Sequence, residues 1–460
     1  MSARTVVMGG GISGLSVALL LARRGFEVTV LERDQAPPGD LAAIGDWHRP
    51  GAPQTRQLHT FLGLFRQHLR THLPDVYEDL LANGAEEVSI ATPDGTTPAG
   101  AEDLAVLASR RPTVEWALER ALRREAGVEI QYGTSVRRAE VKDGRITGVR
   151  VRGGVVDADV LLDAAGRRSP LRDDFTVLEG DEDCGVVYNT RFYRLLDGVP
   201  RPPLKRGVTT MVAGDGFGGG LFYHDNRTFA IGIGRLPDDN DLKALREAEA
   251  FDQVTALFPE FEPWLRPDVS EVLTEVVPMA GLRNTLRGLA PGAPVGYGVL
   301  GDALCTTDPA FGRGASVALH QAVLLAEAFA ADPGALPGLV RDVTARAQAW
   351  VRPWFDDSVQ ADVARTRLWQ AVADGHQLPQ GAGMAVPPVS LFSLMDAGEH
   401  DLHLWQAAQR VAGLLAPVDS LDTPENRRRL QEVWASGRRP QAPSGPSRAD
   451  LVEVLSASSR

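Results

Sequence analysis

The sequence predicts an α/β protein with a Rossmann-like domain, an inserted antiparallel β-sheet domain and a C-terminal helical region. Residues 5–34 predict a buried strand, a glycine-rich turn, a helix and a second strand. Residues 174–277 predict mainly short strands, and residues 336–436 predict mainly helices. Residues 296–300 predict another buried strand of the first domain, so we expect the antiparallel region to be inserted into that domain.

The glycine-rich turn is the strongest local signal. Gly9, Gly11 and Gly14 fit the pattern G-x-G-x-x-G between a strand and a helix. Gly9 lets the chain turn sharply, Gly11 lets the backbone approach a pyrophosphate, and Gly14 lets the helix pack closely on the strand. The helix N-terminus, which includes Ser13, presents free N–H groups to the phosphates. Glu32 ends the second strand, where a carboxylate can accept hydrogen bonds from a ribose, so this stretch predicts an adenine dinucleotide site.

The glycine pattern alone is weak evidence, because it occurs twice more in this chain. Residues 214–219 are followed by Leu221-Phe222-Tyr223 rather than by a helix, which predicts a β-hairpin. Residues 296–301 run along a predicted strand. We therefore expect a dinucleotide at residues 5–34 and a purely structural role for the other two matches.

Composition and charge exclude several classes of partner. The 460 residues carry a net charge of −12, with a pI near 5.3, which argues against nucleic acid or an anionic membrane. The two cysteines, Cys184 and Cys305, cannot form a disulfide framework, and no stretch resembles a zinc site. The first apolar run, residues 15–22, is too short to cross a bilayer. We therefore expect a cytoplasmic protein without a metal ion.

The predicted elements divide the chain into four parts. These are the dinucleotide-binding domain (1–72, 104–173 and 278–335), the substrate domain (73–103 and 174–277), the C-terminal helices (336–436) and a flexible tail with a short terminal helix (437–460). A helix is expected at residues 241–257 of the substrate domain, and two separate helices at 340–351 and 357–371. Asp143-Gly144 predicts a hairpin turn in the first domain.

Three separated motifs stand in a specific order along the chain. They are the glycine turn with Glu32, the stretch from Asp163 to Arg167, and Gly301-Asp302 followed by Pro309…Gly312-Arg313-Gly314. Together they resemble the FAD-dependent monooxygenases of the aromatic-hydroxylase type over about residues 1–340. Within that group, the Pro53-Gln54…His59 segment and the Arg111-Pro112 helix are most similar to the actinobacterial branch that includes polyether epoxidases.

The resemblance implies positions for the adenosine diphosphate half of FAD. Gly9, Gly11 and Gly14 would hold the pyrophosphate, and Glu32 the adenosine ribose. Arg33 would lie along the adenine or its phosphate, and Val136 would meet the adenine through backbone groups. Arg110 or Arg111 matches an arginine that contacts the pyrophosphate side, and the place of Arg111 at the start of a helix favours Arg111.

The resemblance also implies positions for the flavin half of FAD. Asp302 would accept hydrogen bonds from the ribityl chain. Gly312 and Gly314 would present backbone N–H groups and a helix dipole to the negative charge on reduced flavin. In the nearer branch Asn-Pro stands where this chain has Asp308-Pro309.

The activity implied by the resemblance is oxygen transfer to a hydrophobic small molecule. NAD(P)H or a separate flavin reductase would reduce the FAD, O₂ would add at flavin C4a, and the hydroperoxide would hydroxylate or epoxidise a natural-product intermediate, as in antibiotic biosynthesis. The backbone carbonyl of Pro309 would help to hold the hydroperoxide, and His59 and Arg56 are the candidate side chains. Phenol hydroxylation benefits from a base, and the sequence has no clear His/Asp pair, which favours an alkene.

Three alternatives stay open at this point. A flavin-dependent dehydrogenase or reductase would transfer hydride without oxygen transfer. A flavin halogenase is disfavoured because the chain has no Trp-x-Trp-x-Ile-Pro stretch and no obvious tunnel lysine. A flavin-bound module without catalysis would act by binding a partner. Arg191, Tyr193 and His224 are further candidates beside the site.

Overall fold

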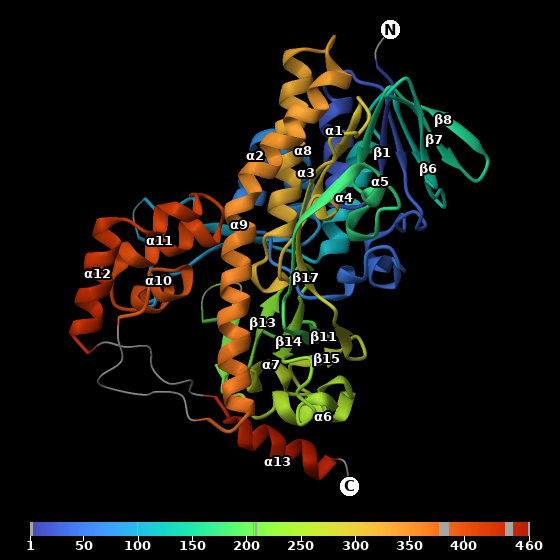
Figure 1. The fold of residues 1–460 in the computed structure, drawn as a ribbon. Coiled ribbons are helices and arrows are strands. Elements are labelled where there is room, and N and C mark those ends of the chain that lie inside the picture. The colour runs from blue at the N-terminus through green and yellow to red at the C-terminus, as the bar shows by residue number, and fades with distance from the viewer. Residues whose placement is uncertain are drawn as a thin grey trace.

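The computed structural model of the protein describes residues 3–98, 100–205, 207, 209–376, 386–437 and 445–458. It confirms the predicted fold class, with a parallel sheet, antiparallel sheets and a C-terminal helical region (Figure 1). The parallel sheet has the order β18-β9-β1-β2-β5. Its strands are β1 (Thr5–Met8), β2 (Val28–Leu31), β5 (Val128–Gln131), β9 (Val160–Asp163) and β18 (Tyr297–Val299).

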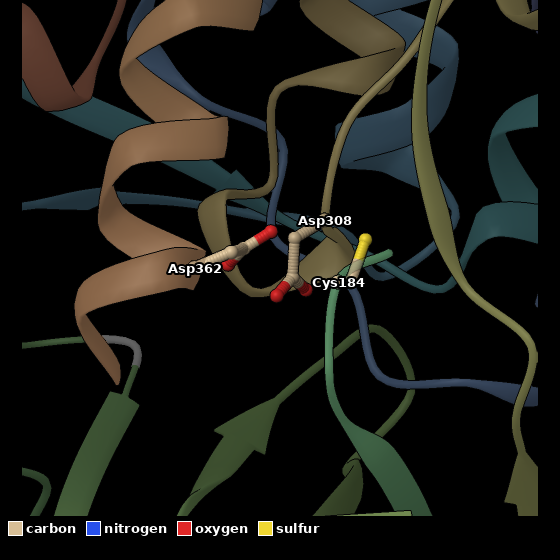
Figure 2. A group of neighbouring side chains, drawn as sticks. All are labelled: Cys184, Asp308 and Asp362. Atoms are coloured by element: carbon tan, nitrogen blue, oxygen red, sulfur yellow. The ribbon is translucent and has the colours of Figure 1, made fainter. Parts of the chain in front are cut away.

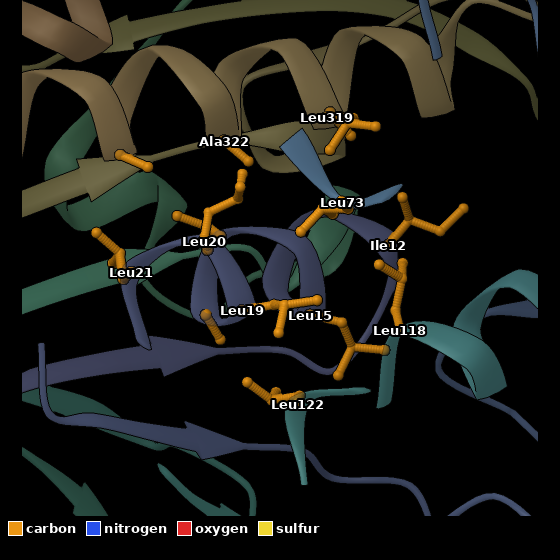
Figure 3. Close-up of a cluster of buried hydrophobic side chains, with 14 of the residues drawn as sticks. Ile12, Leu15, Leu19, Leu20, Leu21, Leu73, Leu118, Leu122, Leu319 and Ala322 are labelled. Atoms are coloured by element: carbon orange, nitrogen blue, oxygen red, sulfur yellow. The ribbon is translucent and has the colours of Figure 1, made fainter. Parts of the chain in front are cut away.

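Helices cover one face of the parallel sheet. Val7 and Leu162 point to this face and belong to the largest buried cluster. The helices that pack into the cluster include α1 (Ile12–Ala22), α2 (Gly63–His72), α3 (Pro74–Ala82), α4 (Arg111–Leu122) and α8 (Gly314–Ala331). Figure 3 shows leucines of α1 between those of α4 and α8. Because side chains alternate along a strand, Val6 and Leu161 instead face the opposite layer.

A small antiparallel sheet forms that opposite layer. It consists of β6 (Arg138–Lys142), β7 (Arg145–Val151) and β8 (Gly154–Asp157). Ile146 and Val149 of β7 pack against Val6 and Leu161. The predicted turn at Asp143-Gly144 is confirmed, and both residues have positive φ, 53° and 71°, as a tight two-residue hairpin requires.

The inserted sheet is antiparallel and has the order β12-β13-β14-β11-β15. Its strands are β11 (Val187–Leu195), β12 (Thr209–Gly214), β13 (Phe217–Tyr223), β14 (Thr228–Arg235) and β15 (Ser270–Val272), and β16 (Val277–Met279) pairs with β11. The second glycine match forms the predicted hairpin between β12 and β13, with Gly216 at a φ of 83°. The third match lies along β18, as predicted.

The sheets also contain five strands that the sequence analysis did not single out. The acidic strand β10 (Thr176–Asp183) pairs with β17 (Arg283–Leu289), which also pairs with the short β19 (Cys305–Thr306). β3 (Glu86–Ser89) and β4 (Ala105–Ala108) form a further two-stranded sheet. Acidic residues have low β-propensity, so β10 depends on its long-range pairing with β17.

Two predicted helix boundaries are wrong. The helices expected at 340–351 and 357–371 form a single helix, α9 (Leu336–Ala373), which contains Pro353 and runs along the molecule (Figure 1). The buried stripe of α9 continues through Val351 and Trp354, so tertiary packing overrides the interior proline. The helix expected at 241–257 is shorter, because Glu247 is extended at φ −91° and ψ 138° before α6 (Ala248–Thr255).

The C-terminal part packs beside α9 and then returns to the inserted sheet. It contains α10 (Leu391–Gly398), α11 (Leu402–Ala412), α12 (Pro424–Ala435) and α13 (Arg448–Ser458). The predicted terminal helix is α13, which packs on α6 (Figure 1). Much of the predicted flexible linker before α13 lies outside the described residues.

The domain boundaries given above stay a prediction. Leu73, Val76 and Leu80, at the start of and along α3, are buried in the same cluster as α1 and α4. Among the described residues α8 is the one helix long and apolar enough to cross a membrane. Because 56% of its apolar window is buried, α8 matches a core helix of a folded domain.

Candidate functional site

The glycine turn has the tight geometry that its sequence predicts. Gly9 has a φ of 109°, and a Cβ atom there would lie 2.5 Å from the Ala164 carbonyl oxygen. A Cβ on Gly14 would lie 1.8 Å from the Gly9 carbonyl oxygen. At Gly11 the nearest atom would be an Arg111 nitrogen at 3.6 Å, so this side of the turn is open. Helix α1 has no side-chain cap, and its first N–H groups are available to an anion.

Glu32 is buried at the end of β2 and already accepts several hydrogen bonds. Its Oε2 accepts from the Gly10 backbone N–H at 2.5 Å, and its Oε1 accepts from the Asp34 N–H at 2.8 Å. Arg49 donates to the same Oε2 at 3.0 Å. Glu32 therefore lies against the glycine turn, as predicted, and its role towards a ribose stays a prediction.

Arg49 is a residue that sequence reasoning missed. Its buried guanidinium pairs with Glu32, with Asp34 at 3.4 Å and with Glu115 at 2.6 Å, and it lies 4.6 Å from the centre of the Trp47 ring. It comes from a loop without periodicity, so no local signal marks it. The arrangement places a cation with three carboxylates directly beside the turn.

The structure separates the roles of Arg110 and Arg111. Arg110 donates through its backbone N–H and its guanidinium to buried Asp225, at 2.5 Å and 2.7 Å, and so joins α4 to the inserted sheet. Arg111 instead donates to Glu115 at 2.9 Å and points toward the turn at Gly11. Glu115 thus holds both Arg49 and Arg111, and of the two predicted arginines it is Arg111 that lies beside the turn, while its role toward a pyrophosphate stays a prediction.

A cavity of about 440 Å³ lies beyond the end of β2. Arg33, Trp47 and His48 are among the residues that line it, and the Arg33 side chain is 43% exposed. The loop before Val136 is attached to this region, because the Thr134 N–H donates to the Glu32 carbonyl at 2.9 Å. Val136 itself is buried. That this cavity holds the adenine end of a cofactor stays a prediction.

Asp163 organises the second motif. It accepts hydrogen bonds from the Tyr297 hydroxyl at 2.9 Å, from the Ala165 N–H at 3.1 Å and from the Ser169 hydroxyl. Burial raises the pKa of this carboxyl. These contacts hold the segment after β9 against Gly9, so Asp163 has a structural part in closing the glycine turn.

Asp302 lies at the carboxyl end of β18 in a small cavity. Gly51, Gln54, Gly166 and Arg167 help to line this space of about 40 Å³. Burial raises the pKa of Asp302, opposed by the charges of Arg111 and Arg167. No described residue donates a hydrogen bond to its carboxylate. An accessible carboxylate without a donor fits a hydroxyl-bearing chain such as the ribityl group of FAD.

The third motif forms a turn at the N-terminus of α8. A 3₁₀ turn, Pro309–Phe311, is followed by Gly312 at a φ of 64°, and α8 begins at Gly314. A Cβ on Gly314 would lie 4.0 Å from an Asp302 oxygen, so the turn and Asp302 adjoin. The Pro309 carbonyl accepts from the Gly312 N–H at 2.9 Å, which leaves it one free lone pair.

Arg313 fixes this turn to α9 from inside the protein. It is 1% exposed, donates to the Trp354 carbonyl at 2.8 Å and to the Ser358 hydroxyl at 2.6 Å, and pairs with Asp357. Gly312 and Gly314 are thereby held on the surface that adjoins Asp302. The roles of Gly312 and Gly314 toward flavin stay predictions.

The candidate catalytic side chains are only partly brought together. His59 Nδ1 lies 2.9 Å from the Gln57 carbonyl, and the His59 N–H donates to His224 Nε2 at 3.3 Å. Burial, and then the charge of Arg111, lower the pKa of His59 to about 4, so the imidazole is neutral at neutral pH. Arg56 is exposed in the preceding 3₁₀ turn.

Arg191 and Tyr193 do not lie beside His59. The Thr190 hydroxyl donates to Gln57 at 2.7 Å and so faces the first domain. Arg191 is the next residue of β11 and points the other way, where it pairs with Asp252 of α6 at 2.6 Å. Tyr193 lies near the same carboxylate. The sequence analysis could not assign Arg191 and Tyr193 to one face of β11, because both faces of this strand are buried.

Comparisons with known proteins point to FAD-dependent oxidoreductases. Residues 4–111 match the family described as FAD dependent oxidoreductase. Protein Rv3254 of Mycobacterium tuberculosis is 26% identical over 384 residues, which cover 72% of this chain and 74% of that protein. Kynurenine 3-monooxygenase of Salinispora tropica is 30% identical over 180 residues, 37% of each chain.

Solved structures share the fold at low sequence identity. PqsL of Pseudomonas aeruginosa, a probable FAD-dependent monooxygenase, superposes with a TM-score of 0.59 at 15% identity and covers 81% of this chain and 99% of its own. The flavin-dependent brominase Bmp2 gives a TM-score of 0.61 at 17% identity, over 95% and 100%. The chain therefore has the fold of FAD-dependent monooxygenases and halogenases, whereas the polyether-epoxidase branch stays a prediction.

Proposed function

We infer that this chain, whose N-terminal part matches the FAD-dependent oxidoreductases and whose fold is theirs, is an FAD-dependent monooxygenase that hydroxylates or epoxidises a hydrophobic natural-product intermediate. The observation that carries the proposal is the meeting of three features, which come from the first and third motifs, at one edge of the parallel sheet. The open side of the glycine turn, the donor-free carboxylate of Asp302 and the N-terminus of α8 adjoin one another there. When bound, reduced FAD would supply the oxygen chemistry through its C4a-hydroperoxide.

The protein's own residues would bind and orient the cofactor. Arg111, held by Glu115, would pair with the pyrophosphate, and the N–H groups of α1 would bind the same anion. Asp302 would accept hydrogen bonds from hydroxyl groups of the ribityl chain. The N-terminus of α8, near Gly314, would favour negative charge on the reduced ring.

The substrate would lie between this edge and the inserted sheet. Leu58 reaches that sheet, where a Cβ on Gly232 would lie 2.4 Å from it, and Thr190 adjoins the same glycine. His59 is neutral, and its Nδ1 is hydrogen-bonded to the Gln57 carbonyl, so it offers no strong base near neutral pH. An apolar alkene, whose epoxidation needs no deprotonation, fits this surface better than a phenol.

The test is rapid-mixing absorbance of the reduced flavoprotein with O₂, with and without candidate alkenes and phenols. A transient spectrum of an oxygen adduct at C4a before reoxidation is expected. Direct return to oxidised flavin under every condition would instead favour a flavin-dependent dehydrogenase or reductase. If purified protein neither contains nor takes up flavin, the cofactor assignment fails.

Two companion proposals concern the setting of the reaction. We propose NAD(P)H as the electron donor, with a separate flavin reductase as the alternative; rapid reduction by added NAD(P)H alone would distinguish them. Both cysteines are free and buried, which suits a reducing cytoplasm. Fractionation of cells that express the protein would test that location.

A further inference from the structure

A cluster of buried polar groups lies directly behind the turn that begins α8. Figure 2 shows Asp308 from the turn, Asp362 from α9 and Cys184 from the segment before β11. One carboxylate oxygen from each aspartate and the sulfur atom of Cys184 lie within 4.8 Å of one another. All three residues are buried, and neither the glycine turn nor Asp302 makes use of them.

Asp308 holds the turn through contacts from several elements. It accepts hydrogen bonds from the Tyr188 hydroxyl at 2.7 Å and from the Ala310 N–H at 2.9 Å, and it pairs with Arg365 at 2.8 Å. Its own N–H donates to the Asn284 side chain at 2.8 Å. The inserted sheet, β17 and α9 therefore all meet at the residue before Pro309.

Asp362 is the second carboxylate of the cluster and is less well satisfied. Its Oδ2 accepts a hydrogen bond from the Asn284 amide at 2.7 Å. Its Oδ1 forms an ion pair with an Arg365 nitrogen at 3.0 Å, but it accepts no hydrogen bond from a described residue. Asp362 is 1% exposed, so no bulk water compensates this oxygen.

The charges of the cluster do not balance if both carboxylates are ionised. Arg365 supplies one positive charge for Asp308 and Asp362, and nearby Arg313 is already paired with Asp357. Burial raises the pKa of Tyr188 and of Cys184, so both stay neutral. Burial, and then the charge of Asp308, raise the pKa of Asp362 to about 8. One retained proton makes the cluster neutral.

A bound cation would neutralise the same charge, but the contacts disfavour it. The guanidinium of Arg365 already contacts both carboxylates and donates to the Cys184 carbonyl at 2.5 Å. A cation on these ligands would lie close to that positive charge and would need the Cys184 thiol to ionise against its raised pKa. A proton on Asp362 requires neither change.

We propose that Asp362 is a proton-holding positioning residue, whose protonated carboxyl donates to Asp308 and keeps the Asp308–Gly314 turn in place. The effect on the cofactor rests on the proposed function, which places reduced flavin against this turn. Loss of the proton leaves an uncompensated negative charge on Asp362, behind Pro309. This charge repels negative charge on the reduced flavin ring and loosens the turn. The cofactor therefore binds more weakly once Asp362 ionises.

Infrared spectroscopy of the purified protein tests the proton itself. The spectrum of Asp362→Asn is subtracted from that of wild type. In this difference spectrum we expect the C=O band of a protonated carboxyl group at pH about 6.5, and we expect it to disappear with a midpoint at pH about 8. The exposed Asp356 on α9 provides the control, and Asp356→Asn keeps the band. Tyr188→Phe removes a donor from Asp308 and moves the midpoint upward. Absence of the band in wild type overturns the proposal.

Flavin binding tests the consequence. From pH about 7 to about 9.5 the FAD dissociation constant of wild type is expected to rise about tenfold, which corresponds to about 1.4 kcal/mol. Asp362→Asn, which cannot ionise, removes most of this rise, whereas Asp356→Asn keeps it. An equal rise in Asp362→Asn overturns the positioning role. If the band is present but oxygen forms no flavin adduct, the monooxygenase proposal falls and the protonated Asp362 stands.

Discussion

At the scale of single residues, contacts with main chain decide which side chains the site tolerates. A Cβ on Gly14 would overlap the Gly9 carbonyl oxygen, which belongs to the rigid turn and cannot move aside as a flexible side chain could. By contrast, a Cβ on Gly39 would meet nothing within 4 Å, and Gly39 has no positive φ. Gly14 and Gly39 therefore serve as a test position and its control.

Gly14→Ala is expected to lower the free energy of unfolding by about 1–3 kcal/mol, the usual cost of an overpacked site. Since the helix must shift away from β1, flavin content falls as well. Gly39→Ala changes stability by less than about 0.5 kcal/mol. Urea unfolding and the flavin-to-protein absorbance ratio measure both effects. Equal behaviour of the two variants would contradict the contact argument.

His224 predicts a pH dependence of stability. Burial lowers its pKa to about 3, and the effect of burial outweighs the opposing charge of Asp225. The unfolded chain takes up this proton below pH about 6.5, while the folded protein does not. Stability due to neutral His224 is therefore present above pH about 6.5 and lost as the pH falls, at about 1.4 kcal/mol per pH unit.

His224→Gln keeps a side-chain acceptor for the His59 N–H and removes this titration. We expect the free energy of unfolding, measured with urea, to fall less steeply between pH about 6.5 and about 4.5 in this variant. The difference in slope corresponds to the uptake of about one proton on unfolding. His400→Gln, at an exposed position, keeps the wild-type slope. An unchanged slope in His224→Gln would show that the histidine is charged in the folded protein.

At the scale of elements, α9 connects the two sheets. Its N-terminal half packs on β18, and its later turns carry Asp362 and Arg365 to the turn at Asp308. Pro353 interrupts the hydrogen-bond ladder of this helix, because it cannot donate to the Ala349 carbonyl. The helix continues because Val351, Trp354 and Phe355 are buried on both sides of the proline.

Pro353→Ala is expected to stabilise the protein by about 2 kcal/mol, the cost of an interior proline less its entropic effect on the unfolded chain. Pro337→Ala is the control, since Pro337 occupies the first turn of the same helix, where proline costs little. Thermal and urea unfolding give both values. A loss of stability in Pro353→Ala would mean that a bend at this proline is needed for the packing of α9.

At the scale of the whole molecule, local sequence signals predicted several elements but not the contacts between residues far apart in the sequence. The β1-α1-β2 unit and the turn at Asp143-Gly144 follow from periodicity and glycine positions, and both are confirmed. The pairing of β10 with β17 and the Arg49 network join residues far apart in sequence. No local pattern encodes them, so the sequence predicted the motifs of the site but not the charges that surround them.

The C-terminal helix gives the last example of such a contact. Arg448 pairs with buried Asp239, with one N–O distance of 2.8 Å, and also with Asp241. Leu451 and Leu455 enter the buried cluster that contains Phe251 of α6. The terminal helix of the tail was predicted from the sequence, but its packing was not: α13 completes the core beneath the inserted sheet.

Leu451→Ala is expected to lower the free energy of unfolding by about 2–5 kcal/mol, because it leaves a cavity at a fully buried position. Hydrogen exchange should rise first in α6, on which α13 packs, while α1 and β1 keep their protection. Glu453→Ala, on the exposed face of the same helix, serves as the control for helix formation. Equal stability and exchange in the two variants would show that α13 does not pack on α6 in solution, and the inserted sheet would then keep its core without the tail.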